Sequence, residues 1–371
     1  MIRIGKFTDF YSDVTKMGTK IPQERYLSKG QFPIIDQGRQ TIAGRWDDED
    51  GIFSDVPAIV FGDHTRAIKY IEEPFFIGAD GVKILRPKNT QDSPKYLFYA
   101  LQAARIPDLG YSRHFKAVKE LDIRVCSKEE QAEIVRILES IDFLIEKRHE
   151  EVRYLDQAVK SRFIELFGDP VRNSMGLPTE PMTTVCAIID GDRGKNYPKQ
   201  DEFSDTGYCL FLNAKNVTAT GFSFENRMFI TKEKDNALHN GKLERGDVVL
   251  TTRGTLGNLA FYDDSVPFEN VRINSGMVIL RMNKSVMTEV FFMEQFKLQL
   301  QSIKGKIASG SAQPQLPIST MNKIRILLAP MALQEQFAAF VEQTDKSKLA
   351  VQKGLQELEI LKKSLMQQYF G

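Results

Sequence analysis

The side chains that could support catalysis do not occur in the spacing that catalysis requires. A metal-dependent nuclease needs an acidic residue two positions before a lysine, but Ala67 holds that position before Lys69, and Asp247 has no better partner. No serine or histidine lies in a nucleophile motif. Adjacent prolines are absent, so the Asn/Asp-Pro-Pro-aromatic motif of amino-methyltransferases is missing, and no glycine loop ends in Lys-Ser or Lys-Thr. We therefore expect neither catalytic activity nor a bound cofactor.

Cysteine usage and composition narrow the class of protein. Cys126, Cys186 and Cys209 are odd in number and lack CxxC spacing, so neither a disulfide framework nor a zinc site is indicated, and the four histidines are scattered. The 371 residues, 42% hydrophobic and 27% charged, suffice for two or three soluble domains. The sequence has neither an apolar run of about 18 residues nor a signal peptide, so we expect a cytoplasmic protein without membrane contact.

The charge is small overall but unevenly spread. A formal net charge of +1 argues at first against nucleic acid as a partner. Residues 130–168 are acidic, however, whereas residues 1–129 and 169–332 are mildly basic. This pattern fits basic binding faces joined by a solvated helix, and it fits an ordinary solvated surface equally well.

One long segment of the chain occurs twice. Residues 130–168 align without a gap on residues 333–371, at a constant offset of 203 positions. The identical pairs are Gln131 and Gln334, Glu139 and Glu342, Asp142 and Asp345, Leu155 and Leu358, Lys160 and Lys363, Ser161 and Ser364, Phe167 and Phe370, and Gly168 and Gly371. Upstream, residues 123–125 match 324–326, and residues 84–86 match 279–281. The pattern predicts a tandem duplication of a globular unit followed by a long helix, the alternative being two unrelated amphipathic helices.

Both copies carry an apolar heptad stripe. In the first copy the stripe consists of Ile134, Leu138, Ile141, Ile145, Val152, Leu155, Val159 and Leu166, with Arg148 and Arg162 interrupting it. In the second it consists of Phe337, Val341, Val351, Leu355, Leu358, Leu365 and Tyr369, widened by Phe340 and Leu361 and weakened at Thr344 and Lys348. A helix of about 37 residues is about 55 Å long, too long to bury such a stripe inside an ordinary domain. We expect the two helices to pack on each other.

The connectivity predicts antiparallel packing of these helices. Gly168, Asp169 and Pro170 stop the first helix, and the second starts only after another globular region. A duplicated unit can close on itself about a pseudo-twofold axis, which pairs like surfaces in opposite directions. There are two alternatives to this packing. The two helices could form a long hairpin-like core, or each could pair with a helix of another chain. The expected domains are residues 1–128 and 169–329, each followed by a long helix, at 129–168 and 330–371.

The two globular regions have the pattern of mixed α and β structure. Short β-branched runs bounded by turn residues predict strands at residues 58–61, 81–85, 247–250 and 276–280. Residues 96–104 and 290–303 are predicted to be helices, the latter followed by a polar loop. The βαβ rhythm and glycine-rich turn of a nucleotide-binding sheet are both missing. The expected fold class is α+β.

The ordered recurrence of these features resembles the DNA-specificity (S) subunit of type I restriction-modification systems. The residues that carry the resemblance are the strand and turn at 58–66, its counterpart at 246–254, and the polar loops at 110–114 and 309–317. Each loop leads into an Ile-Arg-Val or Ile-Arg-Ile strand and then into a glutamine-containing helix start, at Glu130-Gln131 or Glu335-Gln336. The resemblance covers essentially the whole chain.

The resemblance implies a division of labour between subunits. Two target recognition domains would each read half of a bipartite site in double-stranded DNA. The long helices would set the spacer, with half-sites about one turn of B-DNA, or about 34–36 Å, apart, and would dock two methyltransferase subunits. Restriction subunits would supply translocation and cleavage. Two alternatives stay open: a non-catalytic protein-interaction scaffold, and the specificity module of a related modification-only system.

The candidate DNA contacts are polar side chains in the loops of each half. Phosphates are contacted mainly by Arg, Lys, Ser and Thr, whereas base edges are read by Arg, Lys, Asn or Gln. In the first half the candidates are Gln37, Arg39, Gln40, His64, Arg66, Tyr111, Arg113, His114 and Lys116. In the second half they are Arg193, Lys195, Asn196, Asn213, Lys215, Arg253, Lys304, Lys306, Ser309 and Gln313. For each one, the alternative is a solvated surface side chain, and for His64 and His114 a structural role within a loop.

Overall fold

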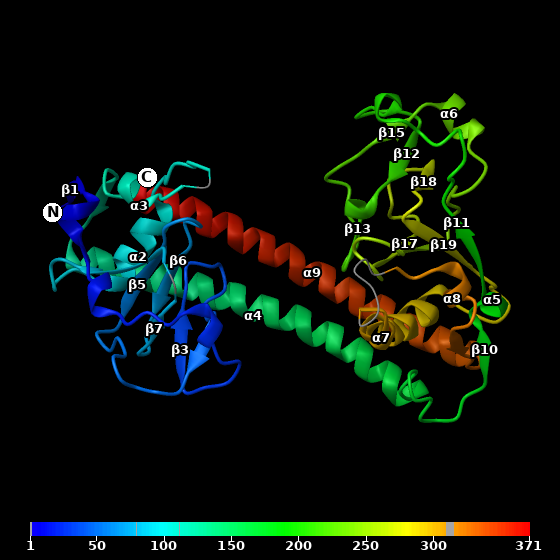
Figure 1. Ribbon diagram of the computed structural model, residues 1–371, viewed down its shortest axis with the longest axis horizontal. Helices are drawn as coiled ribbons and strands as arrows, with labels where there is room; N and C mark the ends of the chain where they lie inside the picture. The colour runs from blue at the N-terminus through cyan, green and yellow to red at the C-terminus, as the bar shows by residue number, and fades with distance from the viewer. Residues whose placement is uncertain (1, 79, 111, 309–314) are drawn as a thin grey trace. The chain divides into compact units, whose positions relative to one another are not determined.

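The computed structural model describes residues 2–78, 80–110, 112–308 and 315–371, with the main chain only at 306–308 (Figure 1). The chain divides into two compact units. Unit 1 comprises Met1–Glu150 and Val351–Gly371, and unit 2 comprises Glu151–Ala350. The two longest helices, α4 (Lys128–Phe167) and α9 (Met331–Phe370), each contribute one segment to each unit. Both units mix helices and sheets, as the sequence predicts.

Unit 1 contains a four-stranded antiparallel sheet, a three-stranded mixed sheet and a strand pair. The four-stranded sheet has the order β2 (Tyr11–Asp13), β8 (Val82–Pro87), β5 (Ala58–Gly62) and β6 (Ile68–Ile71). The second has the order β4 (Gly44–Trp46), β3 (Phe32–Ile35) and β7 (Phe76–Ile77), with β3 and β7 parallel. The pair is β1 (Arg3–Lys6) with β9 (Asp122–Val125). The shorter helices are α1 (Phe7–Phe10), α2 (Pro94–Ala103) and α3 (Phe115–Val118).

Unit 2 has the same strand order and strand directions. Its four-stranded antiparallel sheet is β11 (Cys186–Asp190), β19 (Met277–Met282), β16 (Asp247–Thr251) and β17 (Leu259–Tyr262). Its mixed sheet is β15 (Phe229–Ile230), β12 (Cys209–Leu212) and β18 (Val271–Ile273), with β12 and β18 parallel. The strand pairs are β10 (Thr179–Pro181) with β20 (Arg325–Leu327), and β13 (Val217–Thr218) with β14 (Gly221–Phe222). The shorter helices are α5 (Met182–Val185), α6 (Lys232–Ala237), α7 (Glu289–Ala308) and α8 (Ile318–Met321).

The hydrophobic core of each unit joins the four-stranded sheet to the long helices. In unit 1, Tyr96 and Leu97 of α2 and Leu138 of α4 are fully buried in one cluster, against which Leu365 and Met366 of α9 pack. In unit 2, the rings of Phe163 and Phe167 on α4 contact those of Phe291 on α7 and Phe337 on α9. Burial of large aromatic side chains is among the strongest stabilising contributions available, so the helices are part of each core.

Two equivalent glutamines fasten the long helices to the globular parts. The buried Gln131 accepts from Ser93 N at 2.8 Å through Oε1, and its Nε2 donates to Cys126 O at 3.0 Å. The buried Gln334 accepts from Thr288 N at 2.8 Å, and its Nε2 donates to Ala329 O at 2.8 Å and Val286 O at 3.0 Å. Each glutamine thus links the first turn of α4 or α9 to the start of α2 or α7. Buried polar groups require such partners, so the pairing fixes the direction in which each long helix leaves.

Within each unit the segments of α4 and α9 run in opposite directions. In unit 2, Asp156 pairs with Lys348 and Phe163 contacts Phe337, so residue numbers rise on one helix as they fall on the other. In unit 1, Asp142 pairs with Lys362, while the later residues Leu365 and Met366 of α9 pack against the cluster that holds the earlier residues Ile134 and Leu138 of α4.

The polar interruptions of the stripe are satisfied locally. Thr344 is buried and donates to Phe340 O at 2.9 Å, and Lys348 is paired with Asp156. The prediction that Leu361 widens the apolar stripe is wrong, because its side chain is 46% exposed. In the described part of the chain, no helix is long and apolar enough to cross a membrane.

Candidate nucleic-acid interface

In unit 1, several of the predicted loops meet where β5 ends. The buried Asp63 donates from its main-chain N to Gly81 O at 2.7 Å. Its Oδ1 accepts from Phe115 N at 2.7 Å, and its carbonyl accepts from His114 N at 2.9 Å. Asp63 therefore ties the turn after β5 to the segment that enters α3.

The buried His114 connects the turn after β5 to the segment that precedes α3. It is 1% exposed, with Nδ1 2.9 Å from Asp63 O and Nε2 accepting from Leu109 N at 3.2 Å. Since Asp63 O can only accept, Nδ1 is the donor in that contact, and Nε2 is the acceptor for Leu109 N. Both ring nitrogens are therefore occupied, and the structure reassigns His114 from a DNA contact to a residue that positions its loop.

Gln37 and His64 lie together at this end of β5. The main-chain N of His64 donates to Gln37 Oε1 at 3.3 Å, and the Thr65 hydroxyl donates to Gln37 O. A Cβ on Gly81, which has φ +91°, would lie 2.7 Å from Gln37 Oε1, so glycine is required for this approach. The buried Lys69 donates to Asp36 O at 2.8 Å, and burial lowers the pKa of Lys69. The side-chain oxygen of Gln37 is therefore tied to the main chain of the turn after β5.

The other predicted DNA contacts of unit 1 are exposed, form an ion pair or lie outside the described residues. Arg39, Gln40, Arg113 and Lys116 are exposed. Arg66 has a left-handed backbone (φ +59°), and its guanidinium pairs with Asp108 at 2.7 Å. Its side chain lines a cavity of about 860 Å³ that also involves Lys362 of α9. Tyr111 lies outside the described residues.

The turn after β5, with the loops that Asp63 ties to it, forms what we call a corner of unit 1. Unit 2 has an equivalent corner at the end of β16. Thr252 is buried, and its N and Oγ1 donate to Gly276 O at 2.9 and 3.0 Å. Its carbonyl accepts from Leu316 N at 3.1 Å. Thr252, Gly276 and Leu316 thus make the main-chain contacts that Asp63, Gly81 and His114 make in unit 1. Arg253 takes the place of His64.

The turn at residues 190–194 brings a second arginine to this corner. Arg193 and Arg253 line one recess of about 250 Å³, together with Asp190, Thr252 and Gln315. Sequence reasoning missed Asp190 and Gln315. Asp190 lies only three residues before the predicted contact Arg193, so its place in the same segment was the available signal.

The other unit 2 candidates hold loops or lie on the surface. Asn213 caps a turn by accepting from Lys215 N at 2.9 Å, and Asn196 donates to Ala237 O at 2.9 Å. The side chains of Lys195 and Lys215 are exposed, and that of Lys304 lies against Gly257. Ser309, Gln313 and the side chain of Lys306 lie outside the described residues.

Neither metal ligation nor thiol chemistry is supported at these corners. Among the residues whose placement is described, no group of three or more His, Cys, Asp or Glu side chains could hold a metal ion. All three cysteines are buried and free, and burial raises the pKa of Cys186 and of Cys209 to about 12. Thiols with so high a pKa are not nucleophiles at neutral pH. The polar side chains at these turns are Gln37 and His64 in unit 1 and Arg193 and Arg253 in unit 2.

The chain belongs to the family of type I restriction modification DNA specificity domains, whose family model matches residues 6–154 and 183–360. The type I restriction enzyme MjaVIII specificity subunit of Methanocaldococcus jannaschii is 25% identical over 324 residues, which cover 78% of this chain and 74% of that protein. These matches confirm the resemblance drawn from the sequence.

Solved structures share the fold. The S subunit of a type I restriction-modification system from M. genitalium superposes with a TM-score of 0.59 at 17% identity, covering 100% of this chain and 96% of that one. A chain from a study of complex assembly and conformational transition of the type I R-M system gives 0.50 at 16% identity, covering 100% and 97%.

Proposed function

We propose that this chain is the DNA-specificity subunit of a type I restriction-modification complex and reads a bipartite site in double-stranded DNA. Residues 1–128 and 169–329 act as two target recognition domains, each reading one half-site. The helices at 129–168 and 330–371 pack antiparallel about a pseudo-twofold axis and set the spacer. The chain is non-catalytic and works in the cytoplasm with two methyltransferase subunits and with restriction subunits.

The observation that carries this proposal is the matching corner in each unit. The turn after β5 and the turn after β16 have the same main-chain contacts, yet they present different polar side chains. Gln37 and His64 stand in one corner, and Arg193 and Arg253 stand in the other. A shared scaffold with different donors and acceptors is what two readers of different half-sites require.

Selection from a random duplex pool tests the proposal directly. The full chain is expected to enrich a motif of two short half-sites separated by unread base pairs. Its affinity should fall linearly in log salt, because phosphate contacts release counterions. Binding that enriches a single uninterrupted motif, or that lacks sequence preference, would refute the bipartite reading. The protein-interaction scaffold predicts no DNA binding at all.

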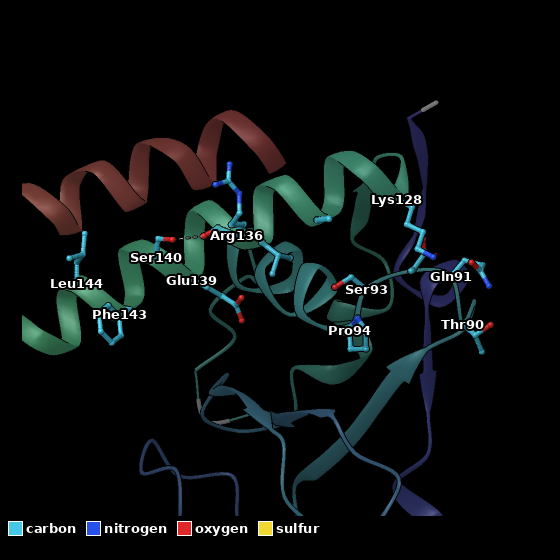
Figure 2. A pocket seen from close by; sticks show the side chains of 13 residues that line it. Thr90, Gln91, Ser93, Pro94, Lys128, Arg136, Glu139, Ser140, Phe143 and Leu144 are labelled. Atoms are coloured by element: carbon cyan, nitrogen blue, oxygen red, sulfur yellow. Dashed lines mark hydrogen bonds between the residues drawn. The ribbon is translucent and has the colours of Figure 1, made fainter.

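A groove on α4 is the proposed docking surface for a methyltransferase subunit. It has a volume of about 910 Å³ and lies between residues 90–94 and one face of α4 (Figure 2). Ala132, Val135, Phe143 and Leu144 give it an apolar lining, and the last two are 57% and 46% exposed. Large apolar side chains gathered in one groove are typical of a protein interface.

Single charge substitutions test the docking surface. Phe143→Asp and Leu144→Asp should each lower the recovery of the methyltransferase subunit in co-purification by tenfold or more, since a buried unpaired carboxylate costs at least about 1–3 kcal/mol. Tyr154→Asp, on the same helix and 69% exposed outside the groove, is the matched control. Equal losses for all three variants would show that the groove is not the docking surface.

A further inference from the structure

The turn that carries Arg193 is held rigidly by its neighbours. A Cβ on Gly191 would collide with the carbonyl of Asn274, so this position accepts only glycine. The buried Asp192 accepts from Gly194 N and from His239 N, both at 2.8 Å. Arg193 therefore projects from a main chain that is fixed on both sides.

The guanidinium of Arg193 is itself held in one orientation. Its Nη2 donates to Asp190 Oδ1 at 3.1 Å and to Ser275 O at 3.2 Å. Within the described residues, Nε and Nη1 have no partner, and the side chain is 49% exposed. A positive group that is anchored at one nitrogen and open at two others can present donors to a ligand at little cost in side-chain entropy.

Arg253 lines the same recess without such support. It follows the buried Thr252, but its guanidinium has no ion pair or hydrogen bond to any residue whose position is described. An arginine free to change rotamer suits a phosphate, which accepts from many directions. Both arginines of this recess are positively charged, but only Arg193 has its guanidinium held by neighbouring residues.

We propose that Arg193 reads a guanine in the half-site of unit 2, that Asp190 positions its guanidinium, and that Arg253 contacts a neighbouring phosphate. Guanine is the base whose major-groove edge carries two adjacent acceptors, O6 and N7, and arginine is a donor only. A fixed donor discriminates between base edges because it cannot move to avoid a donor on the wrong base. This inference rests on the proposed DNA-binding function.

The matching corner of unit 1 predicts a different base there. Its polar groups are Gln37 and His64, whereas Arg66 is paired with Asp108. The arginine of that turn, Arg66, is held by a carboxylate of another loop and lines the cavity that includes Lys362. The polar groups of the two corners therefore differ, and we expect the bases read by the two units to differ as well.

Pool selection with three variants of the full chain tests these roles. Arg193→Ala should make one guanine of the second half-site degenerate, with about a ten- to hundredfold loss of discrimination there. Asp190→Ala keeps the arginine charge, so affinity should stay within about threefold of wild type while preference at the same position falls. Arg253→Ala should leave the motif intact and reduce the slope of log affinity against log salt by about 1.

The first half-site serves as the folding control, because every variant should keep its preference there. If Arg193→Ala lost affinity uniformly for all sequences, Arg193 would contact a phosphate. That result would overturn the guanine assignment but leave the proposed function standing. An unchanged motif in Arg193→Ala would do the same. Failure of the wild-type chain to enrich any split motif would overturn the proposed function as well.

Discussion

A buried carboxylate with two cationic partners organises one end of unit 2. Asp235 on α6 pairs with Lys242 and with Arg272 on β18, and Arg272 also donates to Asn240 O at 2.7 Å and Leu238 O at 3.1 Å. Burial raises the pKa of Asp235, but the hydrogen bonds and charges of Lys242 and Arg272 outweigh it and hold the pKa below the ordinary value of 3.8. The ionised carboxylate is therefore the stabilising form.

Asp235→Asn tests the contribution of this ion-pair network to stability. It should lower the free energy of unfolding by about 3–5 kcal/mol at neutral pH, because two cations lose their buried partner. A lowered folded-state pKa gives stability that is complete above the unfolded-state pKa and lost as pH falls through the folded one. The gap between wild type and variant in urea unfolding should therefore shrink below about pH 3.8.

The fully exposed Asp264, which lies 3.9 Å from Arg245, supplies the control for that measurement. Asp264→Asn should leave the free energy of unfolding unchanged within the error of the measurement, because its carboxylate is solvated in the folded chain. A gap between wild type and Asp235→Asn that stayed constant on acidification would contradict the pairing.

Individual polar side chains were the hardest part to predict from the sequence. His64 and His114 both occur in polar loops, and nothing local distinguishes half-buried His64 from fully buried His114. The difference arises from Asp63, which is distant from His114 in sequence and accepts its ring N–H. Hydrogen bonds between loops that are far apart in the sequence produce no local sequence pattern. The sequence therefore indicates which polar residues lie in the loops, but it does not indicate which way their side chains point.

Helices and strands, by contrast, follow from local pattern. The heptad stripe predicted helices at 129–168 and 330–371, and α4 and α9 span Lys128–Phe167 and Met331–Phe370. The β-branched runs at 58–61 and 247–250 are β5 and β16. Periodicity reports which side of an element is buried, and it can be read without knowing the neighbour. The repeat also paired Gln131 with Gln334, although their contacts with α2 and α7 were not foreseen.

A substitution of Gln334 tests the link between α9 and the start of α7. Gln334→Leu should lower the free energy of unfolding by at least about 2 kcal/mol, because Thr288 N and two carbonyls lose a buried partner at about 1–3 kcal/mol each. Gln336→Leu, at an exposed position of the same helix, should change it by less than about 0.5 kcal/mol. Denaturant unfolding followed by circular dichroism measures both. Equal effects would mean that α9 does not depend on this link.

Insertions into the two long helices test whether these helices set the spacer between the half-sites. Inserting four residues into both α4 and α9 lengthens each helix by about 6 Å, close to two base pairs of B-DNA. The preferred spacer should lengthen accordingly while both half-sites stay the same, as measured by selection from a duplex pool. Insertion into one helix alone should break the pairing of the stripes and weaken binding. An unmoved spacer with binding retained would show that the helices do not set the distance.

The division of the chain has a consequence for biosynthesis. Unit 2 is one continuous stretch, Glu151–Ala350, whereas unit 1 takes its last piece, Val351–Gly371, from two hundred residues further along. Leu365, Met366 and Phe370 complete the apolar cluster around Tyr96. During synthesis, residues 1–150 must therefore wait for residues 351–371 to complete their core, whereas unit 2 can fold before unit 1 does. A chain that lacked residues 351–371 would have an incomplete core in unit 1 and would be an easy target for proteolysis.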